Sequence, residues 1–342
     1  MKQKIIITGG TGYIGSHTAV EFIMKGFNVV LVDDLSNSEV SVLDRIQEIT
    51  GTKPLFEQID LTDNNRTKSF FNAHKDASGV INFAALKAVG ESVKKPIKYY
   101  HNNINILLNV LENMENQGIS NLIFSSSATV YGLPDVLPIT EENQTKRPTS
   151  PYGNTKKVAE EIIEDLTKVS ESLNAISLRY FNPIGAHDSL KIGEAPNGIP
   201  NNLMPFITQT AAGIRRELKI FGNDYDTPDG TAVRDYLHVV DLAKAHVLAF
   251  ERLISNQSKS NFEVYNLGTG TGYSVLDVIN SFEKTTGISL NYSYDKRRDG
   301  DVPQLYSNPN KAQTNLNWKA LLTLDDMTLS SWKWEQNLRN GY

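Results

Sequence analysis

A glycine-rich segment near the start of the chain constrains the fold more than any other feature of the sequence. It reads Thr8-Gly9-Gly10-Thr11-Gly12-Tyr13-Ile14-Gly15, between an apolar run at residues 5–8 and a helical pattern over residues 13–25. Glycines at these positions allow the tight turn, the close approach to a diphosphate and the packing of helix on strand that a dinucleotide site requires. The first helical turn offers unpaired N–H groups to the anion. The segment therefore predicts a phosphate-binding strand–turn–helix unit.

Short β-branched runs extend this unit into a sheet. After the strand at residues 5–8, strands are expected at residues 28–33, 56–61, 80–84, 122–125 and 175–180, separated by helix-sized intervals. Runs that are apolar on both faces indicate parallel strands buried between two layers of helices. The predicted fold class is α/β: a doubly wound parallel Rossmann sheet with a second, smaller α/β lobe.

An acidic residue stands at the end of the second expected strand. Asp33 lies where a dinucleotide site places a carboxylate for the two hydroxyls of the adenosine ribose. A carboxylate there repels a 2′-phosphate, and no Arg or Lys lies between Asp33 and Asp44 to neutralise one. The sequence therefore favours NAD over NADP as the cofactor.

The composition of the chain and its pattern of elements change after Phe181. Residues 182–235 are rich in Asn, Gly, Pro and Asp, with a helix near residues 204–213, and residues 256–342 mix short elements with loops. The length of 342 residues suits two domains. We expect residues 1–181 to form the NAD-binding domain, with a segment returning to it near residues 234–252, and residues 182–342 to form the second lobe. Trp332 and Trp334, in a C-terminal helix, are expected to be packing residues.

A tyrosine and a lysine lie one helical turn apart. Ser150 suits the N-cap and Pro151 the first position of a helix that carries Tyr152 and Lys156. Residues four apart share a helix face, so the two side chains point together. The lysine ammonium and the positive nicotinamide ring favour the phenolate, which is expected to lower the pKa of the tyrosine from about 10. Ser127, after a buried strand, lies at the ligand-binding edge of the sheet and can hold a hydroxyl at Tyr152.

Composition argues against several classes of function. A formal charge of −5 does not suit a surface that binds nucleic acid, because such surfaces carry a basic excess. The chain has no cysteine, and its six histidines show no ligand spacing, so no metal site is expected. The N-terminal apolar run is too short for a signal peptide, and no apolar segment approaches the roughly 20 residues that span a bilayer. We expect a cytoplasmic protein that does not bind membranes.

The glycine segment, the serine and the Tyr-x-x-x-Lys pair, in this order, resemble the extended short-chain dehydrogenase/reductase superfamily. Further segments resemble the UDP-galactose (UDP-glucose) 4-epimerase family in particular, over nearly the whole chain. They are residues 82–92, 125–132, 179–183, 198–205, 220–225, 233–239 and 297–301. Asp34, where this family often has Asn, and Ala85, where Gly is common, depart from its pattern without removing a reacting group.

The resemblance implies a role for each matched residue. The catalytic residues would be Tyr152 as general base, Lys156 and Ser127. The NAD site would be lined by Gly9, Gly12, Tyr13, Ile14, Gly15, Asp33, Asp60, Leu61, Phe83, Ala84, Lys87, Asn102, Tyr152, Lys156 and Phe181. The UDP-sugar site would include Ser127. Asn182, Asn202 and Leu203 would contact the diphosphate, and Arg234 and Arg298 would pair with the phosphates. Lys219, Ile220 and Phe221 would flank uracil, Asp301 would bind the ribose, and Leu305 would lie beside the sugar.

The family also implies a reaction and an assembly. UDP-galactose and UDP-glucose would interconvert through a 4-keto intermediate with retained NAD, as part of galactose metabolism, in a homodimer built through helices of the NAD lobe. Two alternative functions are open to a chain with this fold. A 4,6-dehydratase needs carboxylic acid/base groups at two positions where this chain has Ala128 and Thr129, which cannot do this work. The second alternative is a catalytically silent protein that senses NAD or a nucleotide sugar. Only the intact Ser127, Tyr152 and Lys156 argue against it.

Overall fold

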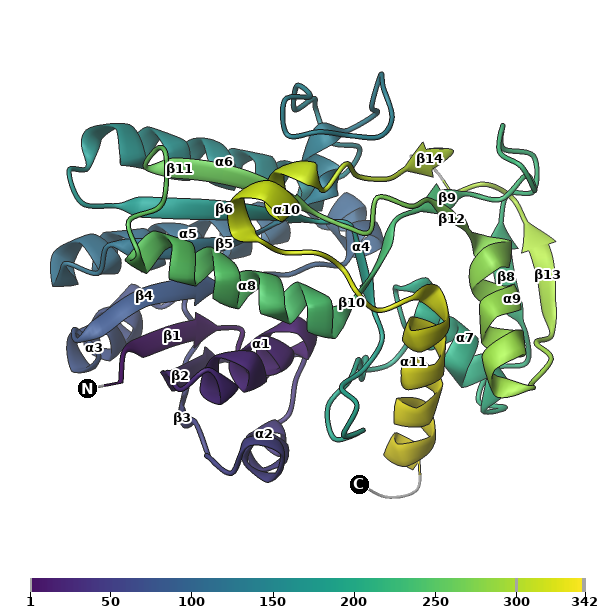
Figure 1. Cartoon of the computed structure of the whole chain (residues 1–342), viewed down its shortest axis with the longest axis horizontal. Helices are drawn as coiled ribbons and strands as arrows, with labels where there is room; N and C mark the ends of the chain where they lie inside the picture. The colour runs from purple at the N-terminus through teal and green to yellow at the C-terminus, as the bar shows by residue number, and fades with distance from the viewer. Residues whose placement is uncertain (1, 299–300, 340–342) are drawn as a thin grey trace.

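A seven-stranded parallel sheet forms the centre of the computed structural model, which describes residues 2–298 and 301–339 (Figure 1). The strand order is β11-β6-β5-β4-β1-β2-β3, so the direction of winding reverses between β1 and β4. Ligands in such sheets bind outside the carboxyl ends of the strands at this reversal. The strands are β1 (Lys4–Thr8), β2 (Asn28–Asp33), β3 (Leu55–Gln58), β4 (Ala77–Asn82), β5 (Asn121–Ser127), β6 (Asn174–Tyr180) and β11 (Phe262–Leu267).

Helices cover both faces of this sheet, which confirms the predicted fold class. One layer contains α1 (Tyr13–Met24), α2 (Val42–Thr50), α8 (Val239–Ile254) and α10 (Asn310–Leu316). The other contains α3 (Asn64–Ala73), α5 (Pro96–Gln117) and α6 (Pro151–Val169), with the short α4 (Val89–Lys94) beside α5 and α6.

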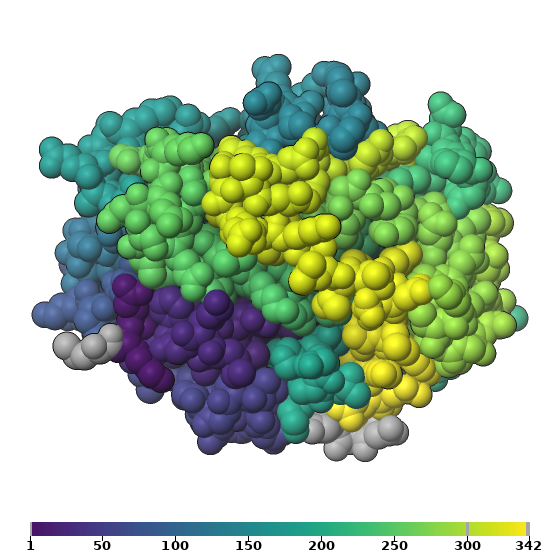
Figure 2. All heavy atoms as spheres, viewed as in Figure 1, coloured from purple at the N-terminus to yellow at the C-terminus, as the bar shows by residue number. Residues whose placement is uncertain are grey.

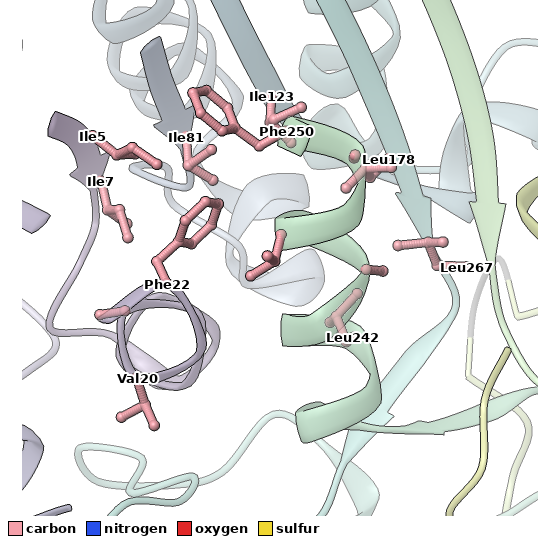
Figure 3. Close-up of a cluster of buried hydrophobic side chains, with 14 of the residues drawn as sticks. Ile5, Ile7, Val20, Phe22, Ile81, Ile123, Leu178, Leu242, Phe250 and Leu267 are labelled. Carbon is pink, nitrogen blue, oxygen red and sulfur yellow. The ribbon is translucent and has the colours of Figure 1, made fainter. Parts of the chain in front are cut away.

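Consecutive side chains of each central strand enter opposite layers. Ile5 and Ile7 pack in the layer of α1 and α8, while Ile6 packs in the layer of α3 and α5, and all three are fully buried. Burial of such a side chain contributes roughly 1.5–3 kcal/mol. Figure 3 shows the first layer, where Phe22 of α1 and Phe250 of α8 approach the strands. α8, which follows residue 234, packs on this sheet and against α1.

Some strand boundaries differ from the predicted ones. The third strand ends at Gln58, so Asp60 and Leu61 lie in the loop beyond it. The fourth strand ends at Asn82 and not at residue 84. The fifth continues to Ser127, because its last three residues still pair with β6. Because the third and fourth strands end earlier than predicted, the residues just after them lie at the sheet edge where ligands bind.

The seventh strand, β11, was not predicted, because residues 256–342 were assigned to the second lobe. It pairs in parallel with β6 along its whole length, from Phe262 opposite Ala175 to Leu267 opposite Tyr180. A glutamate interrupts its apolar pattern, and the structure buries Glu263 by pairing it with Arg252 of α8. The C-terminal part of the chain therefore contributes to the large sheet as well as to the second lobe.

The second lobe is smaller and contains short strands. Ile207, Phe282 and Met327 are fully buried at the centre of its core, between three helices. In Figure 2 the C-terminal residues, in yellow, run across this face from α10 on the large sheet to α11 on the second lobe. Its elements are β7 (Asn182–Ile184), α7 (Leu203–Ala211), β8 (Leu218–Phe221), β9 (Val233–Arg234), β10 (Tyr236–His238), β12 (Tyr273–Ser274), α9 (Val275–Thr286), β13 (Tyr292–Asp295), β14 (Gln304–Leu305) and α11 (Leu324–Arg339).

Candidate active site

A pocket of about 670 Å³ opens at the carboxyl ends of β1 and β4. All fifteen residues predicted for the NAD site line it, and so do Ser127, Asn182 and Asn202 from the predicted UDP-sugar site. The structure thus brings the glycine turn and the three predicted catalytic residues to one cavity at the point where the winding of the sheet reverses.

The glycine turn is packed too tightly for side chains. Gly9 has a φ of +65° and donates its N–H to the Val32 carbonyl oxygen over 2.8 Å. A Cβ added at Gly15 would lie 2.2 Å from the Gly9 carbonyl oxygen. Gly12 is the N-cap of α1, and no side chain in the described part of the protein caps this helix start. The first N–H groups of α1 therefore remain available to an anion in the pocket.

Asp33 connects the end of β2 to the loops around it. Its carboxylate accepts hydrogen bonds from the N–H of Thr11 at 3.2 Å, from the N–H of Leu35 at 3.0 Å and from the hydroxyl of Ser38 at 3.2 Å. The side chain also lines the pocket. The residue predicted to receive the ribose hydroxyls is therefore held at the pocket wall by its neighbours.

The predicted helix start at Ser150 is confirmed. The Ser150 hydroxyl accepts the N–H of Gly153 at 3.1 Å, and Pro151 is the first residue of α6. Tyr152 and Lys156 both face the pocket, as their spacing predicts. The Lys156 ammonium donates to the Ser125 carbonyl oxygen at 2.7 Å and lies 4.9 Å from the centre of the Phe124 ring. The lysine is thus fixed against the end of β5.

The pKa values of this pair are set mainly by burial. Desolvation raises the pKa of Tyr152 to about 12, although a hydrogen bond with Ser127 opposes the rise. Desolvation lowers the pKa of Lys156 to about 8, and the charge of Glu160 opposes that fall. The protein's own groups therefore raise the tyrosine pKa, whereas the expected lowering included the charge of the nicotinamide ring. A further positive charge in the pocket is needed to stabilise the phenolate.

Eight residues predicted for the UDP-sugar site are not among the residues that line this pocket. Arg234 forms an ion pair with Asp301, so the acid predicted to bind ribose already has a cationic partner. Arg298 lies over the Phe221 ring at 4.1 Å. The Lys219 ammonium lies 2.8 Å from both the Ser293 hydroxyl and Glu217. The eight are Leu203, Lys219, Ile220, Phe221, Arg234, Arg298, Asp301 and Leu305.

The side chain of one of these eight residues faces the core of the second lobe. Ile220 is 1% exposed and belongs to the hydrophobic core of the second lobe, with Leu218 and Ile207. Alternate residues of a strand face opposite sides, so its neighbours Lys219 and Phe221 point the other way. Only the backbone of Ile220 is in a position to contact a base.

Glu194 is a pocket residue that the sequence did not suggest. Its carboxylate accepts a hydrogen bond from the Asn202 amide at 2.6 Å and lies 3.6 Å from the Lys87 ammonium. Trp334 donates its indole N–H to the Glu194 carbonyl oxygen at 2.9 Å and is 3% exposed, in agreement with its predicted packing role. Glu194 lies in an irregular loop, where no periodic pattern singles out a functional residue.

Neither a metal-binding cluster nor a membrane-spanning helix occurs in the part of the chain that the structure describes. No cluster of three or more His, Cys, Asp or Glu side chains there has an arrangement that could hold a metal ion. Within the same residues, every helix is too short or too polar to cross a membrane.

The sheet order, the glycine turn and the Ser127, Tyr152 and Lys156 group define the class of this protein as a short-chain dehydrogenase/reductase. Residues 6–330 match the family model described as GDP-mannose 4,6 dehydratase. The UDP-glucose 4-epimerase of Bacillus subtilis is 49% identical over 340 residues, which cover 99% of each chain. The chain belongs to the UDP-glucose 4-epimerase family, within the broader family that this model describes.

Solved structures agree with this assignment. The UDP-glucose 4-epimerase of Stenotrophomonas maltophila, with bound NAD and formylated UDP-arabinopyranose, has a TM-score of 0.95 and 46% identity over 99% of this chain and 100% of its own. The Bifidobacterium longum enzyme, in complex with NAD+ and UDP, has a TM-score of 0.94 at the same identity and coverage.

Proposed function

We propose that this protein interconverts UDP-galactose and UDP-glucose through a 4-keto intermediate, with NAD as a cofactor that stays bound. The observation that carries the proposal is the meeting of Ser127, Tyr152 and Lys156 with the glycine turn in one pocket. We further propose that the enzyme acts in galactose metabolism in the cytoplasm.

The residues at the pocket suit NAD. The uncapped N–H groups of α1, beside Gly12 and Gly15 in the pocket wall, suit the pyrophosphate. The Asp33 carboxylate suits two ribose hydroxyls and repels a 2′-phosphate. When bound, NAD would take the hydride from C4 of the sugar and return it to the other face.

Tyr152 is proposed as the general base that receives the proton of the sugar 4-hydroxyl. Its pKa of about 12 makes the phenol a poor base at neutral pH unless positive charge is added. Lys156 carries one charge near it, and the nicotinamide ring of NAD+ is the second. Ser127, which is hydrogen-bonded to Tyr152, would orient the hydroxyl that is oxidised. The same tyrosine would return the proton when the ketone is reduced.

The UDP part of the substrate is proposed to bind on the second lobe. Asn182 and Asn202 would contact the diphosphate, while Arg234 and Arg298 would pair with its oxygens, since guanidinium forks suit phosphate. Because Arg234 pairs with Asp301 in the protein alone, substrate binding would exchange this contact for one to phosphate. If UDP is held firmly and the sugar weakly, the 4-keto sugar can turn within the site.

The two lobes are proposed to divide these tasks. Residues 1–181, with the return near 234–252, would hold NAD, and residues 182–342 would supply the UDP-sugar contacts. We add β11 and α10 to the first group, because they pack on the large sheet.

The dehydratase alternative is disfavoured by the turn after Ser127. The next residues, Ala128 and Thr129, begin a short 3-10 helix, η1 (Ala128–Tyr131), and neither can act as a carboxylic acid. A silent sensor is opposed by the joint presence of Ser127, Tyr152 and Lys156 in the pocket.

A homodimer through helices of the NAD lobe is also proposed. Val93, Ile97 and Leu108 of α4 and α5 are large apolar side chains that are 59%, 79% and 45% exposed. Sedimentation analysis of Ile97→Asp is expected to show monomers where the unsubstituted protein is dimeric. A protein that is already monomeric would contradict the proposal.

One assay tests the central proposal. Purified protein is incubated with UDP-galactose without added NAD, and UDP-glucose is measured by chromatography. Turnover is expected, and denatured protein is expected to release NAD into the supernatant. Recovery of NADP alone, stoichiometric consumption of NAD or absence of turnover would refute the proposal.

A further inference from the structure

Arg179, near the carboxyl end of β6, contacts two different elements that carry the proposed catalytic residues. It extends from β6, and its side chain is 7% exposed. On one side, its Nε and Nη2 atoms donate to the Glu160 carboxylate at 3.0 and 2.6 Å. On the other side, Nη1 donates to the Tyr131 hydroxyl at 2.8 Å. One guanidinium group therefore bridges Glu160 and Tyr131.

The Glu160 side of this bridge reaches the helix of the tyrosine and lysine. Glu160 lies on α6 one turn after Lys156, and residues four apart share a helix face. Ser177 of β6 also donates to the Glu160 carboxylate, at 2.7 Å. These contacts thus attach α6 to β6 one helical turn after Lys156.

The Tyr131 side of the bridge reaches the turn that carries Ser127. Tyr131 is the last residue of η1, and Ser127 is its N-cap, accepting the Thr129 N–H at 3.2 Å. The Tyr131 ring lies 4.7 Å from the guanidinium carbon of Arg179, and its hydroxyl donates to Asn266 of β11 at 2.7 Å. Ser127 therefore directly precedes this four-residue element, and the Arg179 contact lies at its last residue.

We infer that Arg179 is a positioning residue that fixes the turn bearing Ser127 relative to the helix bearing Tyr152 and Lys156. The inference rests on the proposed function, which assigns the catalytic roles to these three residues. A guanidinium fork holds its partners at fixed angles, which a flexible ammonium does not. Displacement of a reacting group by about 1 Å can cost on the order of 10²-fold in rate.

Stability alone does not account for such a group. Buried ion pairs often add little net stability, because desolvation offsets their attraction. The same domain contains a second buried arginine–glutamate–tyrosine group away from the pocket: Arg252 pairs with Glu263, both 7% exposed, and the Tyr265 hydroxyl donates to the glutamate at 2.9 Å. This second group joins α8 to β11 and contacts neither η1 nor α6 in the described structure. It is the control for the first.

The test compares Tyr131→Phe with Tyr265→Phe, each of which removes one buried hydroxyl from an arginine–glutamate group. In NAD-loaded protein, Tyr131→Phe is expected to lower kcat roughly tenfold with KM within about twofold of the original. Tyr265→Phe is expected to leave kcat within about twofold. Equal effects of the two variants, or an effect of Tyr131→Phe on KM alone, would overturn the inference.

Hydrogen exchange provides a readout that does not depend on turnover. Amide exchange over residues 127–132 is expected to accelerate in Tyr131→Phe and to stay unchanged in Tyr265→Phe. Unchanged exchange over this segment in both would overturn the inference. If the unsubstituted protein does not turn over UDP-galactose, the proposed function fails and the exchange result still decides whether the bridge holds the turn. Arg179→Lys, with Arg252→Lys as control, is expected to repeat the pattern, because lysine lacks the fork.

Discussion

The Lys156 ammonium donates a hydrogen bond to the Ser125 carbonyl oxygen over 2.7 Å. This contact joins α6 to the end of β5, two residues before Ser127. The lysine lies on the helix face that it shares with Tyr152, in a site where burial favours the neutral forms of both side chains. Ionisation of the proposed base therefore depends on what else enters the pocket.

Tyr152→Phe removes the proposed base and leaves the cofactor contacts intact. We expect kcat to fall by on the order of 10²–10⁴, the usual contribution of a placed general base. NAD content is expected to stay near one per chain, because the glycine turn and Asp33 are unchanged. Turnover is measured with UDP-galactose and NAD after denaturation. Turnover close to that of the original protein would show that another group takes the proton.

Gly15→Ala adds a methyl group where the Cβ would lie 2.2 Å from the Gly9 carbonyl oxygen. Backbone cannot yield there without opening the turn, so we expect NAD to be lost on purification and stability to fall by roughly 1–3 kcal/mol. Gly90→Ala is the control, since a Cβ there meets no described atom within 4 Å. Full NAD retention in Gly15→Ala would mean that the turn does not hold the diphosphate.

Leu305→Ser tests whether this residue restricts the sugar. Leu305 pairs with Arg234 through β14 and packs against the cluster containing Tyr131 and Phe181. Its bulk is expected to disfavour an N-acetyl group at C2, so the original protein should prefer UDP-glucose and UDP-galactose. In the variant, the ratio of kcat/KM for UDP-N-acetylgalactosamine to that for UDP-galactose is expected to rise roughly tenfold. A lower Tm with an unchanged ratio would indicate a packing role only.

Acid is expected to destabilise the fold through buried histidines. Burial lowers the pKa of His17 to about 3 and that of His246 to about 4. The unfolded chain binds these protons near pH 6.5, so it binds more protons than the native state between about pH 6.5 and the native pKa values. Stability therefore falls as the pH falls through this window, by about 2 kcal/mol for each histidine between pH 6.5 and 5.

His17→Asn separates this contribution from the general effect of acid. The asparagine amide can replace the imidazole Nδ1, which lies 2.7 Å from the Tyr13 carbonyl oxygen, and it does not titrate. Urea unfolding at pH 6.5 and 5 is expected to show a smaller loss of stability in this variant. The exposed His101 serves as control through His101→Asn. A loss equal to that of the original protein would rule out His17 as a source of the pH dependence.

The sequence by itself determined the features that depend on near neighbours. The glycine turn, the Ser150 N-cap, the position of Asp33 and the shared face of Tyr152 and Lys156 each follow from steric rules within a few residues. Alternating burial of Ile5, Ile6 and Ile7 follows from the two-residue period of a strand. These local rules were enough for the fold class, the glycine turn, Asp33 and the Tyr152–Lys156 pair, whereas the other pocket residues were expected only from the family resemblance.

Only the tertiary structure decided what depends on contacts between distant parts of the chain. A buried glutamate in β11 became acceptable through Arg252, and Glu194 entered the pocket from a loop without a pattern. The direction of the Tyr152 pKa shift was decided by desolvation, because burial outweighs the effects of neighbouring groups. Burial and long-range pairing arise only when the whole chain packs. They depend on residues that are distant in sequence, so a residue's near neighbours do not determine them.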